Sequence, residues 1–185
     1  MSIRKTKEQI IGDIAIQLTF DGGLRRSRVY IEKQSTPNKR KEFRHYLRKE
    51  LRNLMEGILD RENYSDNDHY RTIVAFSVAV SRHSKYRHFL AGNALRIGTA
   101  QKLINLYWKM NWVLKPKFPQ PIHCPFDSII IKKLDRSVHH IHWTQFEDIN
   151  DYKKLVEAAR KKAGALSIAE WELETYKMRT IPDRE

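Results

Sequence analysis

Two residues in the middle of the chain, Lys102 and Asp127, are of the types that amine chemistry needs. A neutral lysine amine can attack a sugar carbon and form an imine, and a nearby carboxylate can orient the amine and stabilise the cation that develops. A free lysine has a pKa of about 10.4, so burial or a second cation must lower it. Lys109 lies two turns further along the same predicted helix face and could assist only at long range.

The residues ahead of Lys102 are small and suit a tight turn. Gly98, Thr99 and Ala100 follow Arg96, and we expect the chain to turn at Gly98 and to open a helix near Thr99. Amides at the start of a helix have no partner within it and attract a phosphate. The sequence therefore predicts a nucleic-acid contact at Arg96, Gly98, Thr99 and Ala100, with Lys109 adding positive charge.

Aromatic side chains lie close to this segment along the chain. An enzyme that acts on a base within a duplex must take the base out of the stack, and aromatic rings then stack on it or fill the gap. Trp108, Trp112 and Phe126 are the candidates for this role, and Phe118 is a further one.

The arrangement resembles the helix-hairpin-helix DNA glycosylases of the 8-oxoguanine type over about residues 90–131. Gly98 precedes Lys102 as the first hairpin glycine of that family precedes its lysine, and Pro125-Phe126-Asp127 matches the family's Pro-x-Asp element. The resemblance implies a helix-hairpin-helix element, Lys102 as nucleophile, Asp127 as its charge partner and DNA as substrate. The sequence departs from the family at Ala100, where a second glycine usually stands.

Two other interpretations of this region stay open. In the first, Gly98 ends a core helix, Lys102 is a solvated residue in the first turn of the helix that follows, and Asp127 caps a helix. In the second, His140 and His142, with His139 beside them, bind a metal together with His123, Cys124 or Asp127, as in a metal-dependent nuclease. No spacing matches a named zinc signature, so we expect neither a metal nor another cofactor.

The charge of the chain indicates its partner. Lys plus Arg number 35 and Asp plus Glu 22, which leaves a net charge of +13 and favours nucleic acid, with DNA preferred. The long predicted helix over 39–61 carries much of this charge on its wet side, in Lys39, Arg40, Lys41, Arg44, Arg48, Lys49 and Arg52. A binding module without catalysis, or a helical protein that recognises an acidic partner, would explain the same charge.

Apolar periodicity predicts a mainly α protein with at most short strands. Helices are expected over 7–20, 39–61, 101–114 and 148–162, with a last one from the capping box at Ser167 and Glu170 to about Lys177; residues 69–81 alternate in part but favour a helix. We expect one compact multi-helix domain over 1–185 with a loosely ordered C-terminal end. A single cysteine and the lack of a long apolar run favour a cytoplasmic protein without a membrane span.

Overall fold

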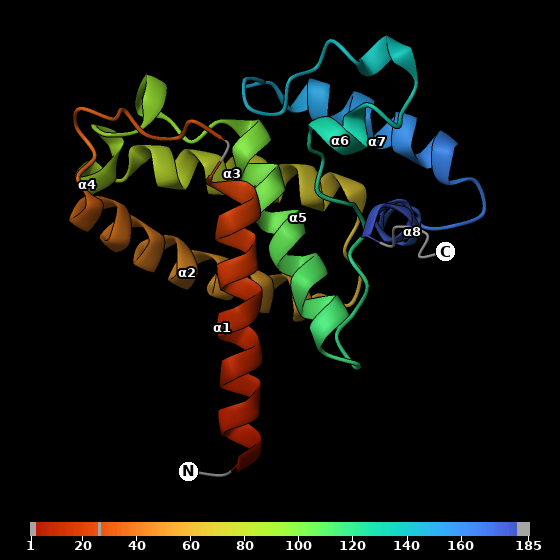
Figure 1. The fold of residues 1–185 in the computed structure, drawn as a ribbon, viewed down its shortest axis with the longest axis horizontal. Coiled ribbons are helices and arrows are strands. Elements are labelled where there is room, and N and C mark those ends of the chain that lie inside the picture. The colour runs from red at the N-terminus through yellow and green to blue at the C-terminus, as the bar shows by residue number, and fades with distance from the viewer. Residues whose placement is uncertain (1–2, 26, 181–185) are drawn as a thin grey trace.

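The structure, a computed structural model, describes residues 3–25 and 27–180, with side chains described for 6–25 and 27–175. It consists of α-helices joined by loops (Figure 1), and its described residues form no β-strand beyond an isolated bridge between Tyr30 and Leu90. The mainly helical fold class is therefore confirmed. The helices are α1 (Ile3–Gly23), α2 (Pro37–Leu59), α3 (Asp66–Arg82), α4 (Ser84–Arg87), α5 (Ile97–Leu114), α6 (Ser128–Ile131), α7 (Ile149–Ala163) and α8 (Ile168–Thr180), with 3-10 turns η1 (Ala91–Asn93) and η2 (Arg136–Val138).

Side-chain caps explain where several helices begin and end. Ser65 and Asp68 form a reciprocal capping box at the start of α3. The predicted capping box of α8 is confirmed, because the Ser167 hydroxyl accepts from the amide of Glu170, and the Glu170 carboxylate accepts from the amide of Ser167. Gly164 ends α7 with a φ of 62°, a conformation that glycine adopts without strain.

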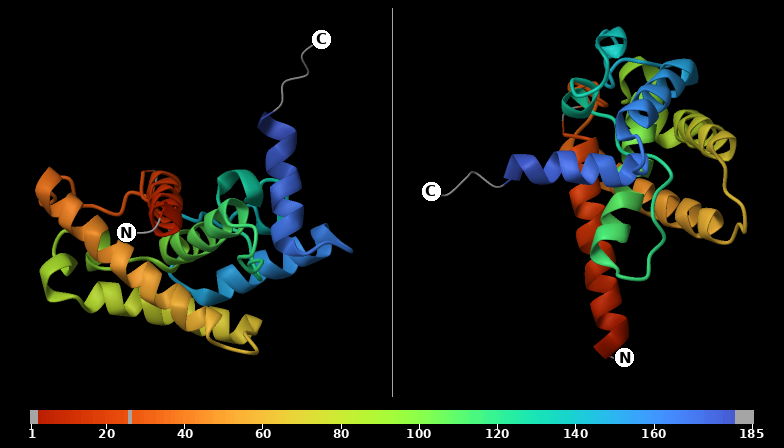
Figure 2. Two further views of the ribbon diagram at one scale, coloured as in Figure 1. Left: turned by 90° about the horizontal axis from the view of Figure 1, so that it is seen from below. Right: turned by 90° about the vertical axis from the view of Figure 1, so that its right-hand side faces the viewer.

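Helix α5 lies at the centre of the fold and contacts α1, α2, α3 and α7. Helix α1 runs beside it, α2 and α3 lie on one side of this pair, and α8 projects on the other (Figure 2). Nearly every residue of α5 from Ile97 to Asn111 is buried, polar ones included. Because α5 is surrounded, each of its polar side chains must find a partner from a neighbouring segment.

The observed helix boundaries correct several expectations. Residues 69–81 belong wholly to α3, so the helical interpretation was right and the partial alternation misleading. Helix α5 begins at Ile97, earlier than expected, and the turns α4 and η1 precede it. The expected loose end at 181–185 lies outside the described residues. None of the helices described is both long and apolar enough to cross a membrane.

Candidate active site

Helix α5 and the loop before α6 bring Lys102 and Asp127 together. Lys102 Nζ lies 3.4 Å from Asp127 Oδ2, although the two residues are separated by 25 positions. The Lys102 side chain is 6% exposed and that of Asp127 is 28% exposed, so the pair lies just below the surface. Lys102 is therefore not the solvated first-turn residue of the alternative interpretation.

Asp127 uses its two carboxylate oxygens for different tasks. Oδ1 accepts hydrogen bonds from the amides of Ile129 and Ile130, at 3.0 and 3.1 Å, and so caps the N-terminus of α6. Oδ2 is turned toward Lys102. The capping function proposed in the alternative interpretation is confirmed, and it holds the second oxygen in place for the amine.

Gln101 fixes the loop that carries Asp127. Its side-chain amide donates to the carbonyl of Phe126 at 2.8 Å and accepts from the Phe126 amide at 3.2 Å. Gln101 and Phe126 are the chain neighbours of Lys102 and Asp127, so this two-point clamp sets the distance between the amine and the carboxylate. Both clamp residues are fully buried, where such hydrogen bonds are strongest.

Trp143 forms the other wall around the lysine. Lys102 Nζ lies 4.0 Å from the centre of the Trp143 ring, which favours a positive charge there. The Trp143 backbone packs directly on Gly98, where a Cβ atom would clash with the Trp143 carbonyl oxygen. Gly98 therefore serves the close approach of two protein segments.

Two hollows meet at this pair. The larger, of about 390 Å³, opens between α1, α5, α6 and α8, and the smaller, of about 300 Å³, opens toward the segment from His139 to Thr144; Lys102 and Asp127 line both. Apolar side chains make up most of the wall of the larger hollow, namely Leu18, Leu106, Met110, Val113, Pro125, Ile129, Ile130 and Leu173. Lys102 therefore borders both hollows.

A second lysine–carboxylate pair lines the larger hollow. Lys109 Nζ lies 2.5 Å from Glu172 Oε2, and both side chains are buried, at 7% and 5% exposed. Burial raises the pKa of Glu172; the nearby Asp127 carboxylate raises it further, and Lys109 opposes both. Lys109 is thus engaged in a buried ion pair rather than in the expected contact with nucleic acid.

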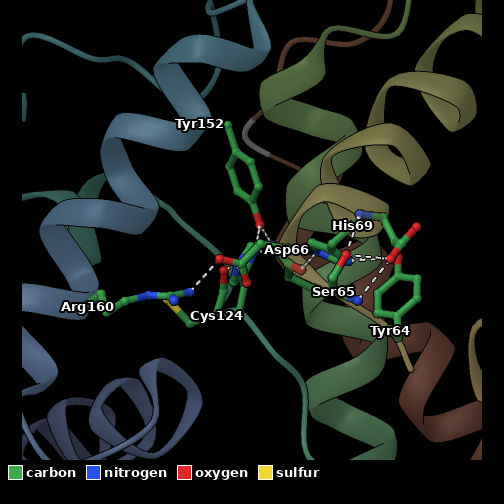
Figure 3. A network of polar contacts seen from close by, with 10 residues as sticks. Tyr64, Ser65, Asp66, His69, Cys124, Tyr152 and Arg160 are labelled. Carbon is green, nitrogen blue, oxygen red and sulfur yellow. Dashed lines mark hydrogen bonds and ion pairs between the residues drawn. The ribbon is translucent and has the colours of Figure 1, made fainter. Parts of the chain in front are cut away.

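A buried polar network supports the far side of α5 (Figure 3). Asn105, one turn after Gln101, donates to Gln101 Oε1, to the Cys124 carbonyl and to Tyr152 Oη, at 3.2, 3.0 and 2.8 Å. His69 Nε2 lies 2.7 Å from Asn105 Oδ1. The network therefore ties α3, α5, α7 and the loop of Asp127 together.

The network continues to the surface through a second histidine. His123 Nδ1 lies 2.9 Å from Tyr152 Oη, its Nε2 lies 3.1 Å from Asp66 Oδ1, and Asp66 Oδ2 pairs with Arg160 at 2.7 Å. Burial lowers the pKa of His69 to about 3 and also lowers that of His123, so both imidazoles are neutral near pH 7.

The predicted phosphate contact at the start of α5 is not available. The amide of Gly98 donates to the Phe146 carbonyl at 3.2 Å, and the amides of Thr99 and Ala100 donate to the Arg96 carbonyl. Gly98, Thr99 and Ala100 are buried, and the Arg96 guanidinium binds the Thr144 carbonyl and lies 3.5 Å from Glu147. The segment 143–146 covers this helix end, which the local sequence did not indicate.

The predicted stacking residues are largely inaccessible. Phe126 is fully buried against Tyr152, and Trp108 is 3% exposed with its indole N–H donating to the Pro119 carbonyl. Trp112 is half-buried on α5. Trp108 and Phe126 therefore act as core residues, and Trp143 is the ring that faces the amine.

The histidine interpretation is also corrected. His139, His140 and His142 are exposed around the turn η2 and the loop after it rather than on a strand, while His123 is buried in the polar network and Cys124 in the core. Within the described part of the chain, no three His, Cys, Asp or Glu side chains are grouped as metal ligands.

Three site residues were missed by sequence reasoning: Gln101, Trp143 and Glu172. Gln101 carries a usable signal, because a polar residue next to Lys102 on a buried helix needs a partner. Trp143 was expected only to pack, and nothing local marks Glu172. A comparison of the chain with protein-family models, curated proteins and solved structures finds no match.

Proposed function

We propose that this protein binds nucleic acid and removes a modified base, or cleaves at an abasic sugar, with the Lys102 amine as nucleophile. The observation that carries the proposal is the Lys102–Asp127 pair, 3.4 Å apart where two hollows meet. A net charge of +13 suits a polyanionic substrate. The partner and the chemistry thus rest on separate features of the molecule.

The proposed step conserves atoms and electrons. A proton first passes from the Lys102 ammonium to Asp127 Oδ2. The lone pair of Lys102 Nζ then forms a bond to the sugar C1′ while the bond from C1′ to the base nitrogen breaks, and the base leaves with that electron pair and takes up this proton. The C1′-bound nitrogen then loses one of its two protons, and its lone pair forms a C=N bond while the C1′–O4′ bond breaks. O4′ takes up a proton, and the product is a protonated, cationic imine. Removal of a C2′ proton then breaks the C3′–oxygen bond, and the 3′ phosphate leaves.

The surroundings of Lys102 give each neighbour a function in this step. Asp127 Oδ2 orients the amine and stabilises the positive charge that develops on the sugar, because its position is held by the α6 cap. The Trp143 face stabilises the cationic imine, because the positive charge of the imine is on the same nitrogen that lies over the ring.

Borohydride trapping tests the proposal. Wild-type protein is incubated with 5′-labelled duplex DNA that contains an abasic site or 8-oxoguanine, and with the matched single strands, in the presence of borohydride. We expect a covalent adduct that Lys102→Gln reduces by at least about 100-fold and Asp127→Asn by about 10-fold or more. Lys154→Gln is the control, because Lys154 is an exposed lysine on α7 paired with Asp151.

The possible results separate the proposal from its alternatives. An adduct that Lys102→Gln does not affect would show that another amine reacts. Tight binding without an adduct on any of these substrates would identify a binding module and contradict the enzymatic proposal. Circular dichroism of each variant shows that a lost adduct is not a lost fold.

A further inference from the structure

A groove between α1 and α2 has the charge of an anion-binding surface. It encloses about 480 Å³, and we call it the α1–α2 groove. Four cations and a histidine line it, and none of its lining residues within the described chain is a carboxylate. The lining residues that matter here are Arg40, Lys41, Arg44, His45, Arg48 and Gln17.

The three arginines form a regular row along α2. Arg40, Arg44 and Arg48 follow one another at intervals of one helical turn, which places them about 6 Å apart along the axis. A single phosphate needs donors that converge on one point, whereas a row of guanidinium groups matches an anion that repeats along a chain. The guanidinium fork suits phosphate oxygens in particular.

The partners of these arginines leave them able to bind. Arg48 and the neighbouring Arg52 both contact Asp13 Oδ1 at 3.0 Å, but the Asp13 side chain is 45% exposed, and such surface pairs exchange readily. Arg40 donates to the Ser35 hydroxyl, which is uncharged. Arg44 lies against the Tyr30 hydroxyl, which is uncharged, and its buried Nε makes no hydrogen bond to a described residue.

Charges around the groove favour the same ligand. Acidic groups beside the groove are already engaged: two arginines share Asp13, Asp21 accepts from the Gln17 amide, and Glu42, in an adjoining hollow with Lys41 and His45, pairs with Lys85. A hollow on the opposite flank provides the contrast, because Lys154, Lys161 and Lys162 of α7 line it together with Asp135 and Glu157. Of these two hollows, the α1–α2 groove is the one that several cations line without a carboxylate.

The groove and the candidate active site lie on the flanks of one helix. Gln17 and Phe20 of α1 line the groove, while Leu18 and Gly22 of α1 line the larger hollow. A helix is about 10–12 Å across with its side chains, and successive phosphates of one strand advance about 3.4 Å along a duplex. Three or so base-pair steps therefore span α1, from the arginine row to the hollow that Lys102 lines.

We propose that the α1–α2 groove binds the sugar-phosphate backbone of the nucleic acid next to the site of reaction. The proposal rests on the proposed function for the class of ligand and adds the surface that holds it. It also replaces the phosphate contact expected at the start of α5, which the protein covers with its own segment 143–146.

Fluorescence anisotropy with a labelled 20-base-pair duplex tests the groove. We expect Arg40→Gln/Arg44→Gln/Arg48→Gln to weaken binding by at least about 30-fold and to lower the slope of log affinity against log salt by about 2–3. The control Lys154→Gln/Lys161→Gln/Lys162→Gln loses the same charge from α7 and should change affinity by less than about threefold. Arg44→Gln alone breaks no hydrogen bond of Nε and should still lower the slope by about 1.

The outcomes distinguish the groove from the enzymatic proposal. Equal weakening in both triple variants, or an unchanged salt slope in Arg44→Gln, would overturn the groove as the binding surface. Competition by polyglutamate or by vesicles with anionic headgroups, as strong as that by unlabelled DNA, would overturn the choice of ligand. Loss of binding in the groove variant with no borohydride adduct in wild type would support the groove and contradict the lyase.

Discussion

The two polar faces of α5 differ in what lies against them. One face carries Gln101 and Asn105, whose amides are held by a buried network of histidine, tyrosine and backbone groups. The other carries Lys102 and Lys109, which face the larger hollow with their carboxylate partners. The face of Gln101 and Asn105, which we call the bonded face, fixes how the neighbouring segments sit on α5. The face of the two lysines borders the hollow.

Lys102 and Lys109 differ in how tightly and how deeply each is paired with its carboxylate. Lys109 and Glu172 are 2.5 Å apart and both nearly inaccessible, whereas Lys102 and Asp127 are 3.4 Å apart and the carboxylate is 28% exposed. A tight and buried pair stabilises one arrangement of α5 and α8. A looser pair at the edge of two hollows can exchange its partner for a substrate.

The largest effect on stability is expected from breaking the buried Lys109–Glu172 pair. Lys109→Met leaves a buried carboxylate without its partner and should lower the free energy of unfolding by about 3–5 kcal/mol. Adding Glu172→Leu removes that carboxylate and should restore most of the loss. Denaturation with urea measures both, and a double variant as unstable as the single one would show that the pair is not the cause.

The next largest loss of stability is expected from replacing Asn105, the residue at the centre of the bonded face. Asn105→Leu removes one hydrogen bond each from His69, Tyr152 and the Cys124 carbonyl and should cost about 3 kcal/mol. Asn111→Leu is the matched control on the same helix, because the Asn111 side chain is also buried but bonds to Tyr107 of its own helix rather than to other segments, and it should cost about 1 kcal/mol. Equal costs would contradict the network. Urea midpoints of the two variants decide between these results.

Acid should weaken the bonded face in a defined range of pH. The pKa of His69 is about 3 in the folded protein against 6.5 when exposed, so the folded state binds fewer protons between these values. Its contribution is complete above pH 6.5 and is lost as pH falls toward 3, by about 1.4 kcal/mol per pH unit. Unfolding free energies at pH 7 and pH 5 test this: His69→Gln should flatten the slope, and a flat wild-type profile would refute the assignment.

The smallest effect on stability is expected at the proposed nucleophile. Lys102→Met removes a partner from Asp127, but that carboxylate is partly exposed and keeps both amide hydrogen bonds to α6. The free energy of unfolding should therefore fall by about 1 kcal/mol or less. A loss as large as that of Lys109→Met would make the two pairs equivalent and remove the distinction between a structural and a reactive lysine.

Local patterns were sufficient for some features of this protein. Periodicity predicted the longer helices, the Ser167–Glu170 capping box was visible in four residues, and the resemblance to a glycosylase family singled out Lys102 and Asp127, which the fold brings together. These features depend on neighbours within a few positions or on the identity of a side chain, both of which the sequence states directly.

Other features depended on which distant segments meet. The sequence by itself determined a basic, mainly helical chain, and it named one lysine and one aspartate as candidates for a site. Only the tertiary structure decided that segment 143–146 covers the start of α5, that Trp143 and Gln101 enclose the pair, and that Glu172 neutralises Lys109. The physical reason is that burial and hydrogen-bond partners are set by packing between segments far apart in the chain, and no local spacing records them.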